Sequence, residues 1–152
     1  MDKEKVPFRH LLWGGEFTSL FDFSWMVGHH AKVSFSDPSW WVFDLGDSLK
    51  ISVECPWRLI QNGNIKVSSD DHRQKFGLPA PIDAATSTTS FLADSVILHV
   101  QVKEGTLDLL IDFEGDYRLE IIPISSGYES WEVEGPAGKY IVAQGGGQFA
   151  EW

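Results

Sequence analysis

The chain has 152 residues, of which 43% are hydrophobic and 22% charged, so it has the length and composition of one folded domain. Its formal net charge is −10, and no cluster of Lys and Arg occurs that would displace counterions from nucleic-acid phosphates. No apolar run has the length of a membrane span, and no signal peptide is recognisable. We therefore expect a cytoplasmic protein that binds neither nucleic acid nor membranes, and whose acidic charge suits a basic protein partner.

Residues 1–27 are expected to form an N-terminal cap over the core of this single domain, which spans residues 1–152. The segment is rich in aromatic residues, but Gly14 and Gly15 interrupt it and disfavour a long helix. A short strand or a turn-rich cover for the core is the expectation.

Residues 28–69 carry alternating polar and apolar residues separated by turn signals, which predicts β-strands. Asp37 to Ser39 marks one turn, and Asn62-Gly63 marks another between two apolar runs. Asn-Gly is a strong hairpin signal, because both central residues of a type I′ turn need a positive φ. This stretch is the first of two expected β-meanders.

Residues 70–94 differ in character and are expected to connect the two halves of the domain. Leu78 to Pro81 contains two prolines, which excludes a regular helix or a central strand there. Asp83 is suited to cap a short helix that would continue through Leu92. One short helix in the connector is therefore predicted.

Residues 95–152 again read as strands, and they resemble residues 28–69. Three landmarks recur in the same order, which favours an internal duplication, although hairpins of similar length also converge on such patterns. The pairs are Phe43–Ile51 with Ile111–Ile121, Trp57–Leu59 with Trp131–Val133, and Gly63, Ile65 and Val67 with Gly138, Tyr140 and Val142. The expected fold is mainly β, with two antiparallel meanders of about four strands each that form a barrel or a sandwich.

Asp70, Asp71 and His72 form the densest group of acidic and imidazole side chains. Two carboxylates and an imidazole are able to bind a divalent ion or to transfer protons. The run also has the composition of a turn or a helix cap, and neighbouring residues in a strand point to opposite faces. We therefore expect no metal and no catalytic role here, and keep a metal-assisted hydrolase that uses Asp71 and His72 as an alternative.

The segment Y-E-S-W-E-V-E places Glu129, Glu132 and Glu134 around Trp131. In a strand, Glu132 and Glu134 share one face, and Trp131 lies on the other. This is the pattern of a solvated edge strand. It is also the pattern of an acidic docking stripe with an aromatic rim, so these four residues, with Asp70, Asp71 and His72, are the candidate binding residues.

Exposed tryptophans would support a different function, a small-ligand or carbohydrate-binding β-domain. Trp40, Trp41 and Trp131 are the candidate stacking platforms for such a ligand. The single cysteine, Cys55, lies in a β-like run and is expected to be a buried structural residue. No signature of a cofactor site or of a known catalytic motif occurs, so we expect no cofactor and no enzymatic activity.

The C-terminal third, Y-E-S-W-E-V-E-G-P-A-G-K-Y-I-V-A-Q-G-G-G-Q-F-A-E-W, resembles an uncharacterised family of small bacterial proteins. Its signature is Y-E-x-W followed by a G-G with a closing Trp, and the matching positions are Tyr128, Glu129, Trp131, Gly145, Gly146, Ala150 and Trp152. Gln144 stands where that tail more often has Pro. The family is of unknown function, and its members look similar to the immunity proteins that bind and block bacterial toxins.

The leading hypothesis is therefore a non-enzymatic protein-binding module, an immunity-type inhibitor of a basic toxin domain, present as a monomer or a homodimer. The glycine run Gly145–Gly147 is a poor phosphate loop, because no basic residue and no helix follow it. We expect it to turn the chain, so that Phe149 and Trp152 fold back as an aromatic plug over the sheet.

Overall fold

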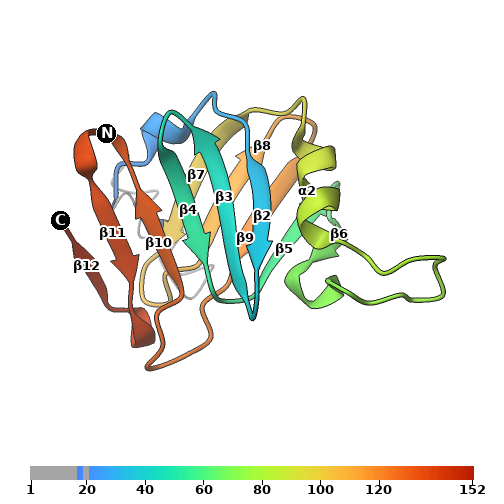
Figure 1. Ribbon diagram of the computed structural model, residues 1–152. Coiled ribbons are helices and arrows are strands. Elements are labelled where there is room, and N and C mark those ends of the chain that lie inside the picture. Colours follow the sequence, from blue (N-terminus) through green and yellow to red (C-terminus); the bar gives the residue numbers. More distant parts are fainter. Residues whose placement is uncertain (1–16, 19–20) are drawn as a thin grey trace.

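The computed structural model describes residues 17–18 and 21–152, which form a β-sandwich (Figure 1). Its strands are β1 (Phe17–Thr18), β2 (Lys32–Ser36), β3 (Trp40–Gly46), β4 (Leu49–Val53), β5 (Trp57–Gln61), β6 (Asn64–Ser68), β7 (Ile97–Lys103), β8 (Leu109–Phe113), β9 (Tyr117–Ile121), β10 (Trp131–Glu134), β11 (Tyr140–Ala143) and β12 (Phe149–Glu151). One six-stranded sheet has the order β1–β7–β8–β9–β5–β6, and the other has the order β12–β11–β10–β4–β3–β2. The sheets are antiparallel and do not close into a barrel. The predicted mainly β fold is confirmed, in its sandwich form.

Each half of the chain contributes strands to both sheets. Strands β2–β4 lie in one sheet and β5–β6 in the other, whereas β7–β9 and β10–β11 take the opposite sheets. The first half therefore supplies five strands, and the second supplies five in the same order followed by β12, rather than the expected four each. The three repeated landmarks fall on equivalent strands. This arrangement agrees with the predicted repeats, while their origin by duplication stays a prediction.

The expected Asn-Gly hairpin is present between β5 and β6. Asn62 has a φ of 50° and Gly63 a φ of 81°, as a type I′ turn requires. β5 then pairs with β9 along its whole length, from Trp57 opposite Ile121 to Gln61 opposite Tyr117. This pairing joins the two halves of the chain within one sheet.

Aromatic side chains fill the space between the sheets. Phe43 and Trp57 are 0% and 1% exposed, and their rings meet edge to face with centroids 5.4 Å apart. Trp41 meets Trp57 in the same way at 5.0 Å. Burial of each such side chain contributes about 2–3 kcal/mol, so these contacts between opposite sheets are a main source of stability.

Helix α2 (Ala84–Leu92) covers one open side of the sandwich, next to the edge strand β2. Asp83 caps it by accepting a hydrogen bond from the Thr86 N–H at 3.0 Å, which confirms the predicted helix and its cap. The hydroxyl of Thr89 accepts the Val33 N–H at 2.8 Å, so the helix also satisfies part of the edge of β2. No helix in the described residues is both long and apolar enough to cross a membrane.

The opposite side is closed by residues before β2. Phe21 and Phe23 are 7% and 4% exposed and pack edge to face on Trp131, and the turn η1 (Ser24–Met26) follows them. This part of the predicted N-terminal cap therefore covers the core. Gly14 and Gly15 lie outside the described residues.

The glycine run forms the turn η4 (Gly145–Gly147), which joins β11 to β12. β12 pairs with β11 and extends the sheet, and the Phe149 ring meets that of Phe21 edge to face at 4.8 Å. Trp152 is 68% exposed and lies beside Tyr140, with ring centroids 5.4 Å apart. The predicted turn is confirmed, but the aromatic plug is wrong for Trp152, because the tail continues as a strand and leaves this ring outside the core.

Candidate functional site

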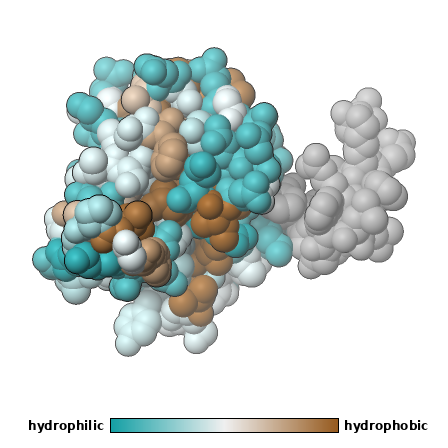
Figure 2. Space-filling model, turned by 90° about the vertical axis from the view of Figure 1, so that its right-hand side faces the viewer, coloured by the Kyte–Doolittle hydropathy of each residue, from teal (hydrophilic) through white to brown (hydrophobic). Residues whose placement is uncertain are grey.

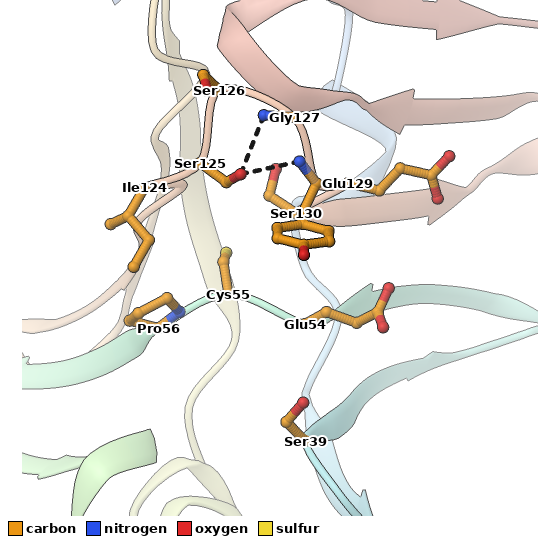
Figure 3. A pocket seen from close by; sticks show the side chains of 11 residues that line it. Ser39, Glu54, Cys55, Pro56, Ile124, Ser125, Ser126, Gly127, Glu129 and Ser130 are labelled. Atoms are coloured by element: carbon orange, nitrogen blue, oxygen red, sulfur yellow. Dashed lines mark hydrogen bonds between the residues drawn. The ribbon is translucent and has the colours of Figure 1, made fainter.

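The candidate site is an open groove of about 950 Å³ at the place where the chain passes from one sheet to the other (Figure 3). One wall is the junction between β4 and β5, and the other is the loop between β9 and β10. The lining residues are Ser39, Glu54, Cys55, Pro56, Ile124, Ser125, Ser126, Gly127, Tyr128, Glu129 and Ser130. A groove of this size accommodates a ligand or a segment of another protein.

Backbone hydrogen bonds fix both walls. The Glu54 N–H donates to the Ser130 carbonyl at 2.9 Å, which holds the junction against the start of β10. The Ser125 hydroxyl accepts from the Gly127 N–H at 3.0 Å and from the Tyr128 N–H at 2.8 Å. The second wall is therefore an ordered turn, and it presents the side chains that follow Ser125 to the groove.

The glycine run supports this second wall from behind. The Gly146 N–H donates to the Ser125 carbonyl at 3.0 Å. A Cβ on Gly145 would lie 2.5 Å from the Cα of Gly127, so only glycine permits this approach of two backbones. Sequence reasoning assigned the glycines to a turn and missed this support. The Y-E-x-W and G-G elements of the tail signature were the available signal, since they meet here.

The groove is acidic. Partial burial, together with the nearby carboxylates of Glu132 and Glu129, raises the pKa of the Glu54 carboxyl. The salt bridges among the described residues involve neither Glu54 nor Glu129. Both carboxylates are exposed, so they are free to pair with a cation that a ligand brings.

Two of the predicted acidic residues lie outside the groove. Glu132 and Glu134 are on β10, which is an interior strand between β11 and β4, so the expectation of an edge strand is wrong. Glu132 accepts a hydrogen bond from the Tyr140 hydroxyl, which raises the pKa of Tyr140 to about 12. Glu134 pairs with Lys50 at 3.5 Å. These two carboxylates have partners on the outer face of the sheet.

Trp131 is 1% exposed, and its indole N–H donates to the Leu107 carbonyl at 2.9 Å. It belongs to the core and does not form the predicted aromatic rim. Trp41 is likewise buried, at 3% exposure, so neither indole is a stacking platform for a carbohydrate. The exposed apolar groups at the groove are instead Ile124 and Tyr128, at 76% and 82%.

In the predicted cluster of acidic and imidazole side chains, Asp71 and His72 each have a structural role. The Asp71 carboxylate accepts the Ser68 N–H at 2.9 Å and caps the turn η2 (Ser69–Asp71). His72 accepts the Ala84 N–H at its Nδ1 at 3.1 Å, and its ring packs on Phe35 with centroids 4.5 Å apart. Within the described part of the chain, no three His, Cys, Asp or Glu side chains are grouped as metal ligands.

Asp70 and His72 nevertheless lie next to the groove. They line a smaller cavity of about 330 Å³ that shares Ser39, Glu54, Cys55 and Pro56 with the groove. The two cavities therefore meet at the junction between β4 and β5.

Cys55 is the only one of these lining residues that carries a thiol, which is a potential nucleophile. Burial raises the pKa of its thiol to about 12, so it stays protonated at neutral pH. Nucleophilic attack requires the thiolate, and Cys55 therefore has the character of a structural residue, as the sequence predicted.

These features define a β-sandwich protein with an open acidic groove between the strand junction and a glycine-supported loop. The chain belongs to the family of unknown function DUF6188, whose model matches residues 25–152. This membership confirms the resemblance to an uncharacterised family, while the likeness to toxin-immunity proteins stays a prediction. Comparisons with the curated proteins and with the solved structures found no match.

Proposed function

We propose that this chain is a non-enzymatic protein-binding module that takes a basic segment of a partner protein into the groove. The supporting observation is that two exposed carboxylates, Glu54 and Glu129, lie in one groove beside the exposed side chains of Ile124 and Tyr128. A protein segment that combines Lys or Arg with apolar residues is complementary to this surface.

The electrostatics of the groove favour a cation over an anion. The raised pKa of Glu54 reflects burial and repulsion from neighbouring carboxylates, and a bound Lys or Arg side chain would relieve the repulsion. The whole chain adds to the effect, because its net charge of −10 attracts a basic protein at a distance. The Tyr128 ring is a further contact for a guanidinium or an ammonium group.

The candidate catalytic side chains in and near the groove also support binding rather than catalysis. Cys55 is held as the thiol, and Asp71 and His72 accept backbone hydrogen bonds that hold local structure. More specifically, we propose that the chain is an immunity-type inhibitor that acts in the cytoplasm on a basic toxin domain. Such an inhibitor needs a complementary surface and no chemistry of its own.

The test is capture of a partner from a lysate of the native host, followed by a binding measurement with the captured protein. Glu129→Lys reverses one groove carboxylate, and Asp94→Lys makes the same change of net charge at an exposed position outside the groove. We expect capture of a basic protein by the wild type and by Asp94→Lys, with affinity that falls as salt rises. We expect binding about tenfold or more weaker for Glu129→Lys.

Equal affinities of Glu129→Lys and the wild type for the captured protein would refute the groove as the binding site. Capture that does not respond to salt would refute the electrostatic part of the proposal. A protein that brings no basic partner from the lysate under either salt condition would refute the proposed function as a whole.

A further inference from the structure

A loop of residues 74–81, which we call the finger, projects from the sandwich between η2 and α2 (Figure 1). Its residues are all exposed, and the apolar side chains of Phe76 and Leu78 are 68% and 49% exposed. Figure 2 views the side of the molecule from which the finger projects, where hydrophobic surface is visible among hydrophilic residues. Adjacent exposed apolar side chains on a projecting loop are typical of an interaction surface.

The base of the finger is firmly held. The Arg73 N–H donates to the Ile82 carbonyl at 2.7 Å, and the Ile82 N–H donates to the Gln74 carbonyl at 2.9 Å. The Arg73 guanidinium donates two hydrogen bonds to the Asp37 carboxylate, at 2.7 and 3.2 Å, and lies over the Phe35 ring. A loop that is ordered before binding loses little conformational entropy when it docks.

The finger has the opposite charge to the rest of the chain. Residues 72–82 contain no Asp or Glu and include Arg73 and Lys75, although the chain as a whole carries −10. Arg73 is neutralised by Asp37, so Lys75 is the cation that the finger presents. Two copies of so acidic a chain repel each other, and contact between a basic patch of one and an acidic patch of the other offsets this repulsion.

The acidic groove provides that complementary patch. Glu54 and Glu129 match Lys75, while Ile124 and Tyr128 match Phe76 and Leu78. The smaller cavity, which Arg73 at the base of the finger also lines, meets the groove at the junction between β4 and β5. Finger and groove therefore belong to the same end of the molecule, as a symmetric exchange between two copies requires.

We infer that the chain forms a two-fold symmetric homodimer in which the finger of each copy occupies the acidic groove of the other. Lys75 pairs with the groove carboxylates, and Phe76 and Leu78 cover Ile124 and Tyr128. This inference rests on the groove of the proposed function and adds a regulation to it. A basic partner has to displace the finger, so dimerisation and partner binding compete.

The first measurement is the mass in solution, by light scattering or sedimentation over a range of concentrations and salt. The wild type is expected to show a dimer that weakens as salt rises. The double variant Phe76→Ser/Leu78→Ser is expected to raise the dissociation constant of the dimer roughly a hundredfold. Ile65→Ser, at an exposed apolar residue of β6 outside the groove and the finger, serves as the control and is expected to leave it unchanged.

Charge exchange gives the sharper test. Lys75→Glu and Glu129→Lys are each expected to weaken the dimer about tenfold, because each places like charges in both symmetric contacts. An equimolar mixture of the two variants is expected to recover the dimer. In the mixed dimer, one contact is that of the wild type and the other has both charges reversed.

A monomeric mass for the wild type at all concentrations would overturn the inference, as would a mixture that stays monomeric while the wild type dimerises. The outcome is separate from that of the proposed function. The groove does not depend on Lys75, so partner binding can occur without the dimer. A monomeric wild type that still captures a basic partner therefore refutes the dimer alone. Partner binding that Glu129→Lys leaves unchanged, with a dimer that both charge variants weaken, refutes the partner site alone.

Discussion

Replacement of Gly147 by Ala is expected to lower the free energy of unfolding by about 3 kcal/mol. The residue has a φ of 81°, and this left-handed conformation alone costs an L side chain roughly 1 kcal/mol. In addition, the new Cβ would lie 1.8 Å from the carbonyl oxygen of Gly105, within the hairpin between β7 and β8. Both atoms belong to the main chain or are fixed to it, so η4 or the hairpin has to move, at a further cost of about 1–3 kcal/mol.

Gly138→Ala is the matched control for this variant. Gly138 ends the turn η3 (Pro136–Gly138), between β10 and β11 of the same sheet, and its φ is 76°. A Cβ there would meet no atom within 4 Å, so only the conformational cost applies. The entropy that Ala removes from the unfolded chain is the same in both variants and cancels in the comparison.

Urea unfolding of both variants, followed by tryptophan fluorescence, measures the difference. We expect Gly138→Ala to lose about 1 kcal/mol and Gly147→Ala about 3 kcal/mol, with unchanged dependence on urea concentration. Equal losses would show that the close approach of Gly147 to Gly105 makes no energetic demand. Gly147 would then act only as an ordinary turn residue, while Gly145 and Gly146 would keep their contacts with the second wall of the groove.

Three further outcomes are expected. Glu54→Gln stabilises the domain at pH 7 by a few tenths of a kcal/mol, because burial and neighbouring carboxylates raise the pKa of Glu54 and penalise its ionised form. The gain disappears when unfolding is measured at a pH below the carboxyl's unfolded pKa, where both states are protonated, and a loss at pH 7 would contradict this account. Cys55 reacts slowly with iodoacetamide at pH 7 and rapidly in urea, because burial raises its thiol pKa to about 12; a fast native reaction, measured by mass spectrometry, would contradict burial. Asp83→Ala is expected to lower the free energy of unfolding by about 1 kcal/mol at pH 7. The Thr86 N–H lowers the pKa of Asp83, so this stabilisation is present above the pKa of the unfolded carboxyl and is lost as the pH falls through the folded pKa. The wild type and the variant should therefore converge in stability in acid.

Local signals were sufficient for most of the strands and for the helix. The Asn62-Gly63 turn, the period of two in β10, and the cap at Asp83 each depend on neighbours in sequence, and each has the expected form. The number of sheets and their order depend on contacts between distant segments. The passage of the chain from one sheet to the other at Glu54 to Pro56 has no local signature beyond the proline.

The candidate site was less accessible to sequence reasoning. Its walls come from Ser39, from residues 54–56 and from residues 124–130, which only the folded chain brings together. The pattern around Trp131 correctly separates the tryptophan from Glu132 and Glu134, but periodicity does not state which face of a strand meets the core. The face of β10 that carries Trp131 packs into the core, so the exposed apolar side chains at the groove come from the preceding loop.

The acidic residues of this region divide into two groups by what the fold requires of them. Glu132 and Glu134 have partners in Tyr140 and Lys50, and their charges are compensated within the sheet. Glu54 is tied to the fold through its backbone, because its N–H donates to Ser130, while its carboxylate stands near other carboxylates and has a raised pKa. A glutamine at this position would keep the backbone bond and avoid the repulsion. The raised pKa of Glu54 agrees with the proposal that the groove binds a cationic partner, and the supporting observation stays the placement of two exposed carboxylates beside Ile124 and Tyr128.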